Sequence, residues 1–210
     1  MRKTSILIAD DHKLIREVWT MFLSSDDRFS IAATCESGEE AVLLAKKLRP
    51  DVILMDINLK GLNGFDATAM IRKTLPGSKV IGVSMHAQPC YAKKMLKMGA
   101  MGFVTKSSPL AEMFKAIVEV NKERKYICEE VRKAISSRVF DENTDQSGMN
   151  WLSSREMEII DHVKLGNSSK EIGRMLNVSA RTIDVHRYNI MKKLKVKNTA
   201  ALINLVNKAG

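Results

Sequence analysis

The stretch that decides the fold is residues 52–58, which read Val-Ile-Leu-Met-Asp-Ile-Asn. Four consecutive apolar residues followed by a carboxylate are typical of a short strand buried on both faces of a parallel sheet. Similar short runs predict companion strands at 6–9, 31–34, 80–83 and 103–105. Helical patterns alternate with them, near 14–24, 39–48, 64–74, 91–98 and 109–120. This alternation predicts a doubly wound α/β domain with a five-stranded parallel sheet, the flavodoxin-like arrangement.

The second part of the chain carries only helical patterns. One more helix is expected at 129–139, and residues 141–148 then read Asp-Glu-Asn-Thr-Asp-Gln-Ser-Gly, which predicts a flexible linker. Four helices are expected after it, at 157–165, 172–176, 181–194 and 199–208. Capping residues predict where helices begin, namely Ser37 with Glu40, Ser108 before Pro109, Ser153 with Glu156, Ser168 with Glu171, Ser179, and Asn198.

The composition is that of a basic globular protein. Hydrophobic residues make up 45% of the 210 residues, and the formal net charge is +10. No apolar run approaches the ~18–20 residues that span a bilayer, and the N-terminal run is too short for a signal peptide, so a cytoplasmic protein without membrane contact is expected. The three cysteines, Cys35, Cys90 and Cys128, are scattered, which predicts reduced packing residues. Residues 170–197 hold 8 basic and 2 acidic side chains, which indicates a polyanionic partner.

Polar side chains follow four of the expected strands. Asp10 and Asp11 follow the first strand, Asp56 the third, Ser84 the fourth and Lys106 the fifth. Sites in open α/β sheets form beyond the carboxyl ends of the strands, so these side chains are expected at one edge. Three carboxylates repel one another unless a cation joins them, and all-oxygen ligands suit Mg²⁺. A carboxylate can also attack phosphorus, with a metal, an ammonium and a hydroxyl holding the phosphoryl oxygens.

With these residues, the chain resembles the receiver domain of response regulators over about residues 4–122. The acidic pair and the loop that begins at Asp56, Asp-Ile-Asn-Leu-Lys-Gly-Leu-Asn-Gly, carry the resemblance. The resemblance implies that Asp56 is the phosphoacceptor. It implies that Mg²⁺ is bound by Asp10, Asp11, Asp56 and the backbone carbonyl of Asn58. The implied phosphoryl donor is a sensor histidine kinase.

The same resemblance assigns three further roles and shows two departures. Lys106 would pair with the phosphoryl group, Ser84 would move to hydrogen-bond it, and Phe103 would reposition when Ser84 moves. Lys60 and Ser107 stand where the family usually has proline, in the second case often after a cis bond. A cis bond before a residue other than proline costs ~2.5–4 kcal/mol, so the geometry before Ser107 stays open.

Residues 181–194 predict the second helix of a helix-turn-helix. At about 100° per residue, Ile183, Ile190 and Leu194 share one face, which is expected to be the core. The opposite face is expected to enter the major groove, with flanking cations on phosphates. The expected DNA-binding residues are Lys170, Arg181, Thr182, Asp184, Val185, Arg187, Tyr188, Lys192 and Lys193. Among them, Arg187 and Lys193 are assigned to phosphates.

The C-terminal part resembles the LuxR-type output domain over about residues 150–208. Its pattern is Leu-Ser-x-Arg-Glu, Lys-Glu-Ile, Arg-Thr-Ile-x-x-His-Arg and Lys-Lys-Leu. One departure is Gly173, where the family usually has alanine; glycine costs ~1 kcal/mol inside a helix, which predicts a softer helix. A receiver followed by this domain resembles the NarL/FixJ group of transcription regulators.

The combined resemblance implies three segments and a function. The receiver would occupy 1–122, a connecting helix and linker 123–149, and an all-α, four-helix DNA-binding domain 150–210. Phosphorylation would switch homodimerisation and sequence-specific binding to double-stranded DNA. RNA polymerase is a further candidate partner.

Two alternatives stay open. Phosphatases of the haloacid-dehalogenase type also use an aspartyl nucleophile with Mg²⁺, but they need a second aspartate where this chain has Asn58. The other alternative is a regulator that works without phosphate and uses the receiver as a dimerisation scaffold, against which the intact set of polar strand-end residues argues. We expect a receiver that phosphorylates and dephosphorylates itself, and not an enzyme that turns over a separate substrate.

Overall fold

The computed structural model describes residues 2–139, 152 and 154–209, and the chain divides into two compact units, 1–140 and 141–210. The expected linker at 141–148 and the expected N-cap residue Ser153 lie outside the described residues. The helix expected at 129–139 is present as α6 (Glu129–Val139) and is part of the first unit, which therefore extends beyond residue 122. Among the described residues, no helix combines the length and the apolar character needed to cross a bilayer.

A parallel sheet of six strands, ordered β2-β1-β3-β4-β5-β6, forms the centre of the first unit. Its strands are β1 (Thr4–Ala9), β2 (Phe29–Cys35), β3 (Val52–Asp56), β4 (Lys79–Ser84), β5 (Gly102–Thr105) and β6 (Tyr126–Ile127). The predicted doubly wound sheet is confirmed, and β3 is buried along its whole length. The expected number of five strands is wrong by one. The sequence did not predict β6 because two residues are too few to show a periodicity, yet β6 pairs with Gly102 and Phe103 and covers the β5 edge.

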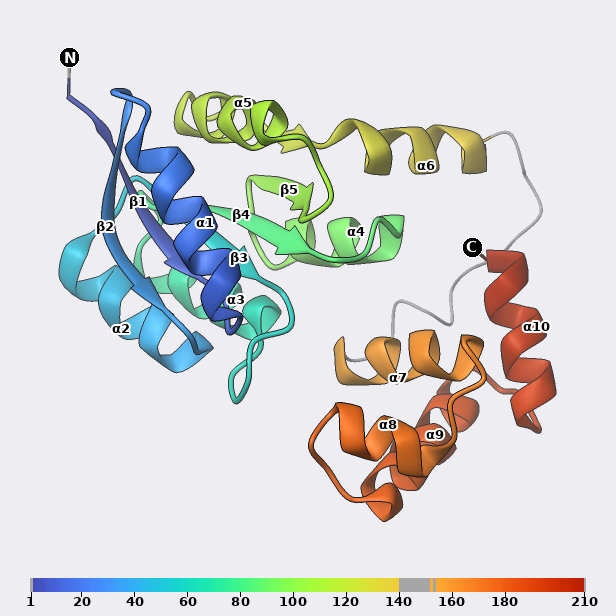
Figure 1. Cartoon of the computed structure of the whole chain (residues 1–210). Coiled ribbons are helices and arrows are strands. Elements are labelled where there is room, and N and C mark those ends of the chain that lie inside the picture. The colour runs from blue at the N-terminus through green and yellow to red at the C-terminus, as the bar shows by residue number, and fades with distance from the viewer. Residues whose placement is uncertain (1, 140–151, 153, 210) are drawn as a thin grey trace. The chain divides into compact units, whose positions relative to one another are not determined.

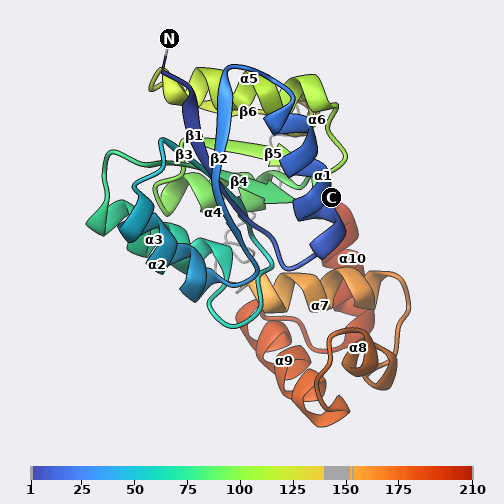
Figure 2. The ribbon, with the colours of Figure 1, turned by 60° about the vertical axis from the view of Figure 1, so that its left-hand side comes forward.

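Helices cover both faces of this sheet (Figures 1 and 2). They are α1 (Lys13–Ser24), α2 (Gly38–Leu48), α3 (Gly64–Thr74), α4 (Pro89–Lys97) and α5 (Leu110–Asn121), followed by α6. All five predicted helices are present with ends shifted by no more than two residues. In Figure 2 the sheet separates α5 from α2 and α3, and α6 packs on α4 and β5. Because all the strands are parallel, their carboxyl ends lie at one edge of the sheet.

The predicted helix starts are confirmed in part. The Ser37 hydroxyl accepts a hydrogen bond from the Glu40 amide at 3.2 Å, but the Glu40 carboxylate accepts from the Glu36 amide, so only half of that capping box forms. At Ser168 and Glu171 both halves of the box are present. The prediction for Ser108 is wrong, because α5 begins one residue later, with Pro109 at the N-cap position.

The second unit contains α7 (Ser154–Lys164), α8 (Ser169–Met175), α9 (Ala180–Lys193) and α10 (Thr199–Ala209), which confirms the four predicted helices. The predicted inner face of α9 is buried, with Ile183 and Ile190 fully covered and Leu194 at 8% exposure. Close packing explains why glycine occupies position 173. A Cβ there would lie 2.8 Å from the carbonyl oxygen of Val178, so glycine lets the turn between α8 and α9 approach closely.

Candidate metal centre and nucleic-acid interface

The structure brings the five predicted polar residues together at the carboxyl edge of the sheet. They are Asp10, Asp11, Asp56, Ser84 and Lys106, delivered by β1, β3, β4 and β5. Asp10 and Asp56 are buried, at 3% and 2% exposure. One oxygen from each aspartate lies within 4.8 Å of the others. The sequence therefore located this cluster correctly, and the roles of its members stay predictions.

Lys106 is the cation that compensates the buried aspartates. Its Nζ lies 2.7 Å from Asp56 Oδ2 and 2.7 Å from Asp10 Oδ2. Burial raises the pKa of the Asp56 carboxyl above its usual range, although the Lys106 charge opposes this shift. Burial would lower the pKa of Lys106, but Asp56 and Asp10 outweigh that effect and raise it. Lys106 and Asp56 are therefore held together by mutual attraction in a buried site.

The chain turns sharply after Asp56. One carboxylate oxygen of Asp56, Oδ1, is bonded within this turn, and the other, Oδ2, faces Lys106. The Asn58 amide donates to Asp56 Oδ1 at 3.1 Å, and the Gly64 amide donates to the Ile57 carbonyl at 3.2 Å. A Cβ at Gly64 would lie 2.0 Å from the Asp56 carbonyl oxygen, so the loop closes against its own start only with glycine there. The Asn58 carbonyl stays a predicted metal ligand.

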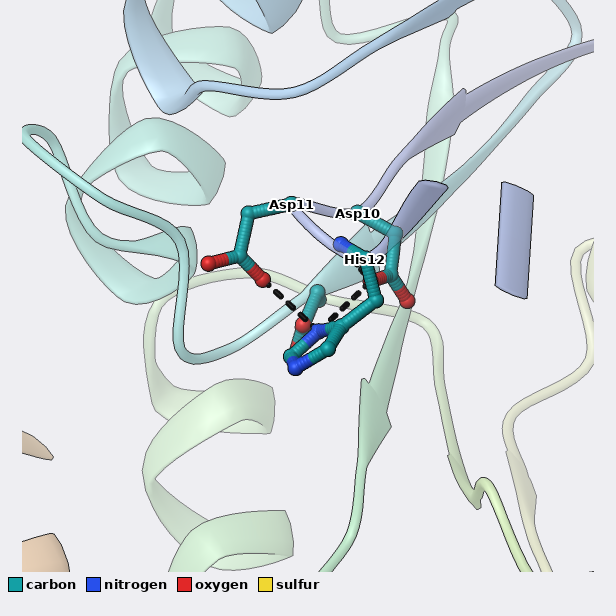
Figure 3. A group of neighbouring side chains, drawn as sticks. Asp10, Asp11 and His12 are labelled. Carbon is teal, nitrogen blue, oxygen red and sulfur yellow. Dashed lines mark hydrogen bonds and ion pairs between the residues drawn. The ribbon is translucent and has the colours of Figure 1, made fainter. Parts of the chain in front are cut away.

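His12 belongs to the same cluster, and the sequence analysis did not single it out. Figure 3 shows the ring beside both aspartates, with Nδ1 at 2.8 Å from Asp11 Oδ1 and 3.2 Å from Asp10 Oδ1. The His12 amide also donates to Asp10 Oδ1 at 2.9 Å. The signal that could have found His12 is its place directly after the acidic pair.

The donor set fits a hard divalent cation. Asp11 Oδ1 is buried and accepts no hydrogen bond from the described residues, since its approach to His12 Nδ1 lacks hydrogen-bond geometry. A buried oxygen without a donor is costly unless a cation or water satisfies it. Three carboxylates with one unsatisfied oxygen match the preference of Mg²⁺ for oxygen ligands. The acidic cluster is therefore compatible with Mg²⁺ binding.

The two predicted switch residues are both in the interior of the first unit. Ser84 is 0% exposed, and its hydroxyl accepts a hydrogen bond from the His86 amide at 2.9 Å. Phe103 is also 0% exposed and lies on β5, the neighbouring strand. A movement of Ser84 would have to break the contact with His86 first.

The two departures from the receiver pattern have structural consequences. Lys60 is exposed, with its Nζ 3.8 Å from Asp11 Oδ2. The loop that lacks proline at this position is instead held by Glu39, whose carboxylate accepts from the Leu62 amide at 2.8 Å. The peptide bond before Ser107 is trans, which answers the question that the sequence left open.

The predicted groove-facing surface of α9 is exposed to solvent. Val185 is 54% and Tyr188 62% exposed, and both lie on the side of α9 opposite the buried Ile183 and Ile190. Four polar members of the predicted set on α9 are also exposed, namely Arg181, Thr182, Asp184 and Lys192, and so is Lys170 on α8. The surface has the mixture of cations and apolar groups expected of a helix that binds in the major groove.

Two members of the predicted set have partners inside the second unit. Arg187 donates to the Ser169 hydroxyl on α8 and to the Thr199 hydroxyl on α10, both at 3.0 Å. The Nζ of Lys193 lies 2.6 Å from Glu156 on α7, a carboxylate that is nearly fully buried. These two cations therefore brace α9 against the other three helices, a role that sequence phasing alone did not indicate.

The first unit is an α/β domain with an acidic pair, a further aspartate and a lysine at one edge of its sheet, and the second unit is a helix-turn-helix. Together they define a class of regulators that join a phosphoacceptor domain to DNA binding. Family models agree with this division. Residues 6–118 match the response regulator receiver domain, and residues 150–206 match the bacterial regulatory proteins of the luxR family. The chain belongs to the two-component response regulators, with a receiver domain and a LuxR-type DNA-binding domain.

Two relatives are similar in sequence over nearly the whole chain, and one solved structure is similar to about two thirds of it. Response regulator GacA of Pseudomonas viridiflava is 31% identical over 98% of this chain and 96% of its own length. Transcriptional regulatory protein DegU of Brevibacillus brevis is 33% identical over 97% of this chain and 93% of its own length. The crystal structure of a LuxR-family response regulator from Aurantimonas sp. SI85-9A1 matches with a TM-score of 0.63 at 29% identity, covering 66% of this chain and 99% of that one.

Proposed function

We propose that this response regulator accepts a phosphoryl group on Asp56 from a sensor histidine kinase, and that phosphorylation promotes homodimerisation and sequence-specific binding to double-stranded DNA. The observation that carries the proposal is the position of Lys106 Nζ, 2.7 Å from both Asp56 and Asp10 at an edge that holds three carboxylates. The protein would act in the cytoplasm, where DNA is accessible. Contact with RNA polymerase is part of the same proposal.

The chain's own groups suffice to position the transfer. A carboxylate oxygen of Asp56 forms the bond to phosphorus while the bond from phosphorus to the donor nitrogen breaks, and the donor imidazole leaves with that electron pair. Asp10, Asp11 and Asp56 would hold Mg²⁺, which neutralises charge on the phosphoryl oxygens when bound. The Lys106 ammonium then exchanges its contact with Asp56 for a phosphoryl oxygen, and the Ser84 hydroxyl donates to another.

The geometry favours this function over a separate turnover activity. An aspartyl phosphate must be lost by attack of water, and in phosphatases with an aspartyl nucleophile a second carboxylate assists the proton transfers. In this chain Asn58 occupies that sequence position, and its neutral side chain cannot transfer a proton as a carboxylate does. We therefore propose that phosphorylation and dephosphorylation of Asp56 are slow reactions of the receiver on itself.

For DNA, we propose that Val185, Tyr188 and Arg181 contact base edges. Lys192 would lie on the same face, Thr182 and Asp184 would flank that face, and Lys170 would contact phosphate. The proposal rests on the exposure of this surface and on the burial of the opposite face of α9. Arg187 and Lys193 stay in the predicted set, but their charged groups already have partners on neighbouring helices.

Labelling with acetyl phosphate tests the phosphoacceptor. The full chain is incubated with acetyl phosphate and Mg²⁺, and its intact mass is measured. Wild type is expected to gain one phosphoryl group and Asp56→Asn none. Asp27→Asn is the matched control, because Asp27 is a fully exposed aspartate on the same unit. Labelling of Asp56→Asn to the wild-type extent would overturn the assignment.

A further inference from the structure

We infer that Glu130, on α6, is a positioning residue for Lys106, so that the phosphoryl site is completed by a helix outside the segment that matches the receiver family. The inference rests on the proposed function of Asp56. Glu130 Oε2 accepts a hydrogen bond from the Thr105 hydroxyl at 2.8 Å and one from the Ser107 hydroxyl at 3.3 Å. These two residues flank Lys106 in the sequence, so one carboxylate holds the chain on both sides of the lysine.

The contacts around Thr105 leave little freedom for this segment. Thr105 is 0% exposed, and its hydroxyl lies 2.8 Å from the Ser108 hydroxyl and 3.1 Å from that of Ser107. A threonine hydroxyl has one proton and can accept two hydrogen bonds. Thr105 therefore donates to Glu130 and accepts from Ser108, and it also accepts from Ser107, whose single proton is shared between Thr105 and Glu130. A saturated network of this kind fixes one backbone conformation around Lys106.

The first turn of α6 is a rigid support for the Glu130 carboxylate. The Cys128 amide donates to the Phe103 carbonyl at 3.0 Å, and Cys128 and Val131 are both 0% exposed. On the other side, the Glu112 carboxylate on α5 accepts from the Glu129 amide at 3.0 Å. The start of α6 is thus fixed to both β5 and α5, which is what a residue needs in order to position another one.

Part of this arrangement depends on Ser107, a residue that departs from the receiver pattern. It stands where the receiver pattern usually has proline, a residue that has no hydroxyl. The Ser107 hydroxyl lies within reach of both Thr105 and Glu130, so the departure adds a donor on the side of the loop that faces α6. The loop is consequently fixed by side chains where a proline ring would restrict it through its backbone.

The arrangement also couples the site to α6 in the reverse direction. Lys106 contacts Asp56 directly, and Glu130 holds the two neighbours of Lys106. If the Glu130 contacts stabilise the position of Lys106 that binds a phosphoryl group, then binding of the phosphoryl group by Lys106 stabilises the Glu130 contacts by the same free energy. α6 is the last element of the first unit, so this coupling reaches the end of that unit.

The test compares Glu130→Ala with Glu129→Ala in the full chain. Glu129 is the neighbouring residue in the same helical turn, so both variants remove one first-turn charge, but the Glu129 carboxylate pairs with Lys133 and not with the loop. Phosphorylation by acetyl phosphate is followed by intact mass over a range of Mg²⁺ concentrations. For Glu130→Ala the saturating rate is expected to fall on the order of tenfold, less than the roughly hundredfold loss that a displacement of about 1 Å can cause, because Lys106 keeps its contacts with Asp56 and Asp10. The Mg²⁺ concentration for half-maximal rate is expected to be unchanged, because the acidic cluster does not move.

Conservative variants separate positioning from a general loss of stability. Glu130→Gln keeps an acceptor oxygen and is expected to recover most of the rate, whereas Ser107→Ala removes one donor and is expected to lower it by a smaller factor. Hydrogen exchange of the α6 amides tests the coupling from the phosphoryl site to α6. Beryllofluoride is expected to change the exchange rates of these amides in wild type and not in Glu130→Ala. If Glu130→Ala does not fold, Ser107→Ala and Glu130→Gln decide the question by the same rates.

The outcomes distinguish this inference from the proposed function. Wild type that is never labelled on Asp56 would contradict the proposed function itself. Wild type that is labelled, with Glu130→Ala and Ser107→Ala labelled at the same rate, would overturn only the positioning role. A lower melting temperature of Glu130→Ala with an unchanged rate would also overturn it, since that is the result expected if Glu130 only stabilises α6.

Discussion

Asp11 is the least compensated carboxylate of the acidic cluster. Lys106 lies 2.7 Å from Asp56 and from Asp10, whereas the nearest lysine to Asp11 is Lys60, with an exposed ammonium at 3.8 Å. A loose, exposed ion pair of this kind contributes little to stability. The other close partner of Asp11 is the His12 ring, with Nδ1 at 2.8 Å, which carries a positive charge only when protonated. Three carboxylates against one buried ammonium therefore leave uncompensated negative charge at the edge of the sheet, and a divalent cation would remove that repulsion.

Magnesium is expected to stabilise the folded chain. A cation that binds only the folded state at ten times its dissociation constant adds about 1.4 kcal/mol to the free energy of unfolding, which corresponds to a rise of several degrees in melting temperature. Asp11→Ala should abolish this rise, because it removes the buried oxygen that lacks a donor. Differential scanning calorimetry with and without Mg²⁺ measures both effects.

Asp27→Ala is the control for this magnesium prediction. Its carboxylate is fully exposed and remote from the acidic cluster, so the variant should keep the wild-type response to Mg²⁺. A wild-type melting temperature that does not respond to millimolar Mg²⁺ would contradict the metal site. An equal rise in Asp11→Ala would place the cation elsewhere.

At the scale of elements, α9 has one face in the core and is braced at its middle and at its C-terminal end. Arg187 connects it to α8 and α10, and Lys193 connects it to α7. Hydrogen bonds from a charged donor are stronger than neutral ones and fix the direction of the side chain. The orientation of the exposed surface that carries Val185 and Tyr188 therefore depends on these braces as well as on the apolar core.

Arg187→Ala and Lys170→Ala are expected to weaken DNA binding in different ways. Loss of Lys170, an exposed cation, should lower the slope of binding against salt concentration by about one phosphate contact and leave the melting temperature unchanged. Loss of Arg187 should lower the melting temperature of the second unit and change the slope little, because its hydrogen bonds are internal. Salt titrations and thermal unfolding measure the two quantities. A salt slope lower by one with unchanged stability for Arg187→Ala would show that Arg187 contacts a phosphate.

Tyr188→Ala is expected to change which bases are preferred. Tyr188 is 62% exposed on the groove-facing surface, so its loss should cost ~1–3 kcal/mol at the base pairs it contacts and leave the salt slope unchanged. A randomised-site selection on wild type and on Tyr188→Ala measures the preference. Lys170→Ala is the control, since loss of a phosphate contact should weaken all sequences alike. An unchanged motif for Tyr188→Ala would contradict the groove assignment.

The sequence predicted those features that depend on local pattern. Five strands and their helices follow from short apolar runs and helical periodicity, and the acidic cluster follows from what stands at each strand end. The features that it did not predict depend on contacts between distant segments. β6 has two residues and exists because it pairs with β5, and the roles of Arg187 and Glu130 require knowing which helices surround them. The Ser108 prediction failed for a local reason, because the Ser108 hydroxyl is engaged by Thr105 instead of capping α5.

For the whole molecule, the central question is how an event in the first unit changes the second. The phosphoryl site lies in residues 1–140 and the helix-turn-helix in residues 141–210. Dimerisation offers a route that needs no fixed contact between the two units of one chain. Two linked DNA-binding domains bind adjacent half-sites with a higher effective concentration than separate ones, so a receiver that dimerises on phosphorylation raises DNA affinity directly.

Beryllofluoride, which stands in for the phosphoryl group on Asp56, is therefore expected to shift the full chain from monomer toward dimer in the presence of Mg²⁺. Analytical ultracentrifugation measures the change, and the same addition should tighten binding to a pseudo-palindrome with half-sites about one helical turn apart. Binding to a single half-site should change little, because one domain suffices for it. This comparison separates dimerisation from a change within the DNA-binding domain.

Asp56→Asn is the control for the dimer prediction, since it lacks the carboxylate that binds beryllofluoride. It should sediment as a monomer with or without the reagent and bind the pseudo-palindrome weakly in both conditions. A wild-type chain that is already a tight dimer, unchanged by beryllofluoride, would contradict the switch. Tighter binding to a single half-site without any dimer would instead require phosphorylation to act on the helix-turn-helix within one chain, and α6 with Glu130 would then be the first segment to examine.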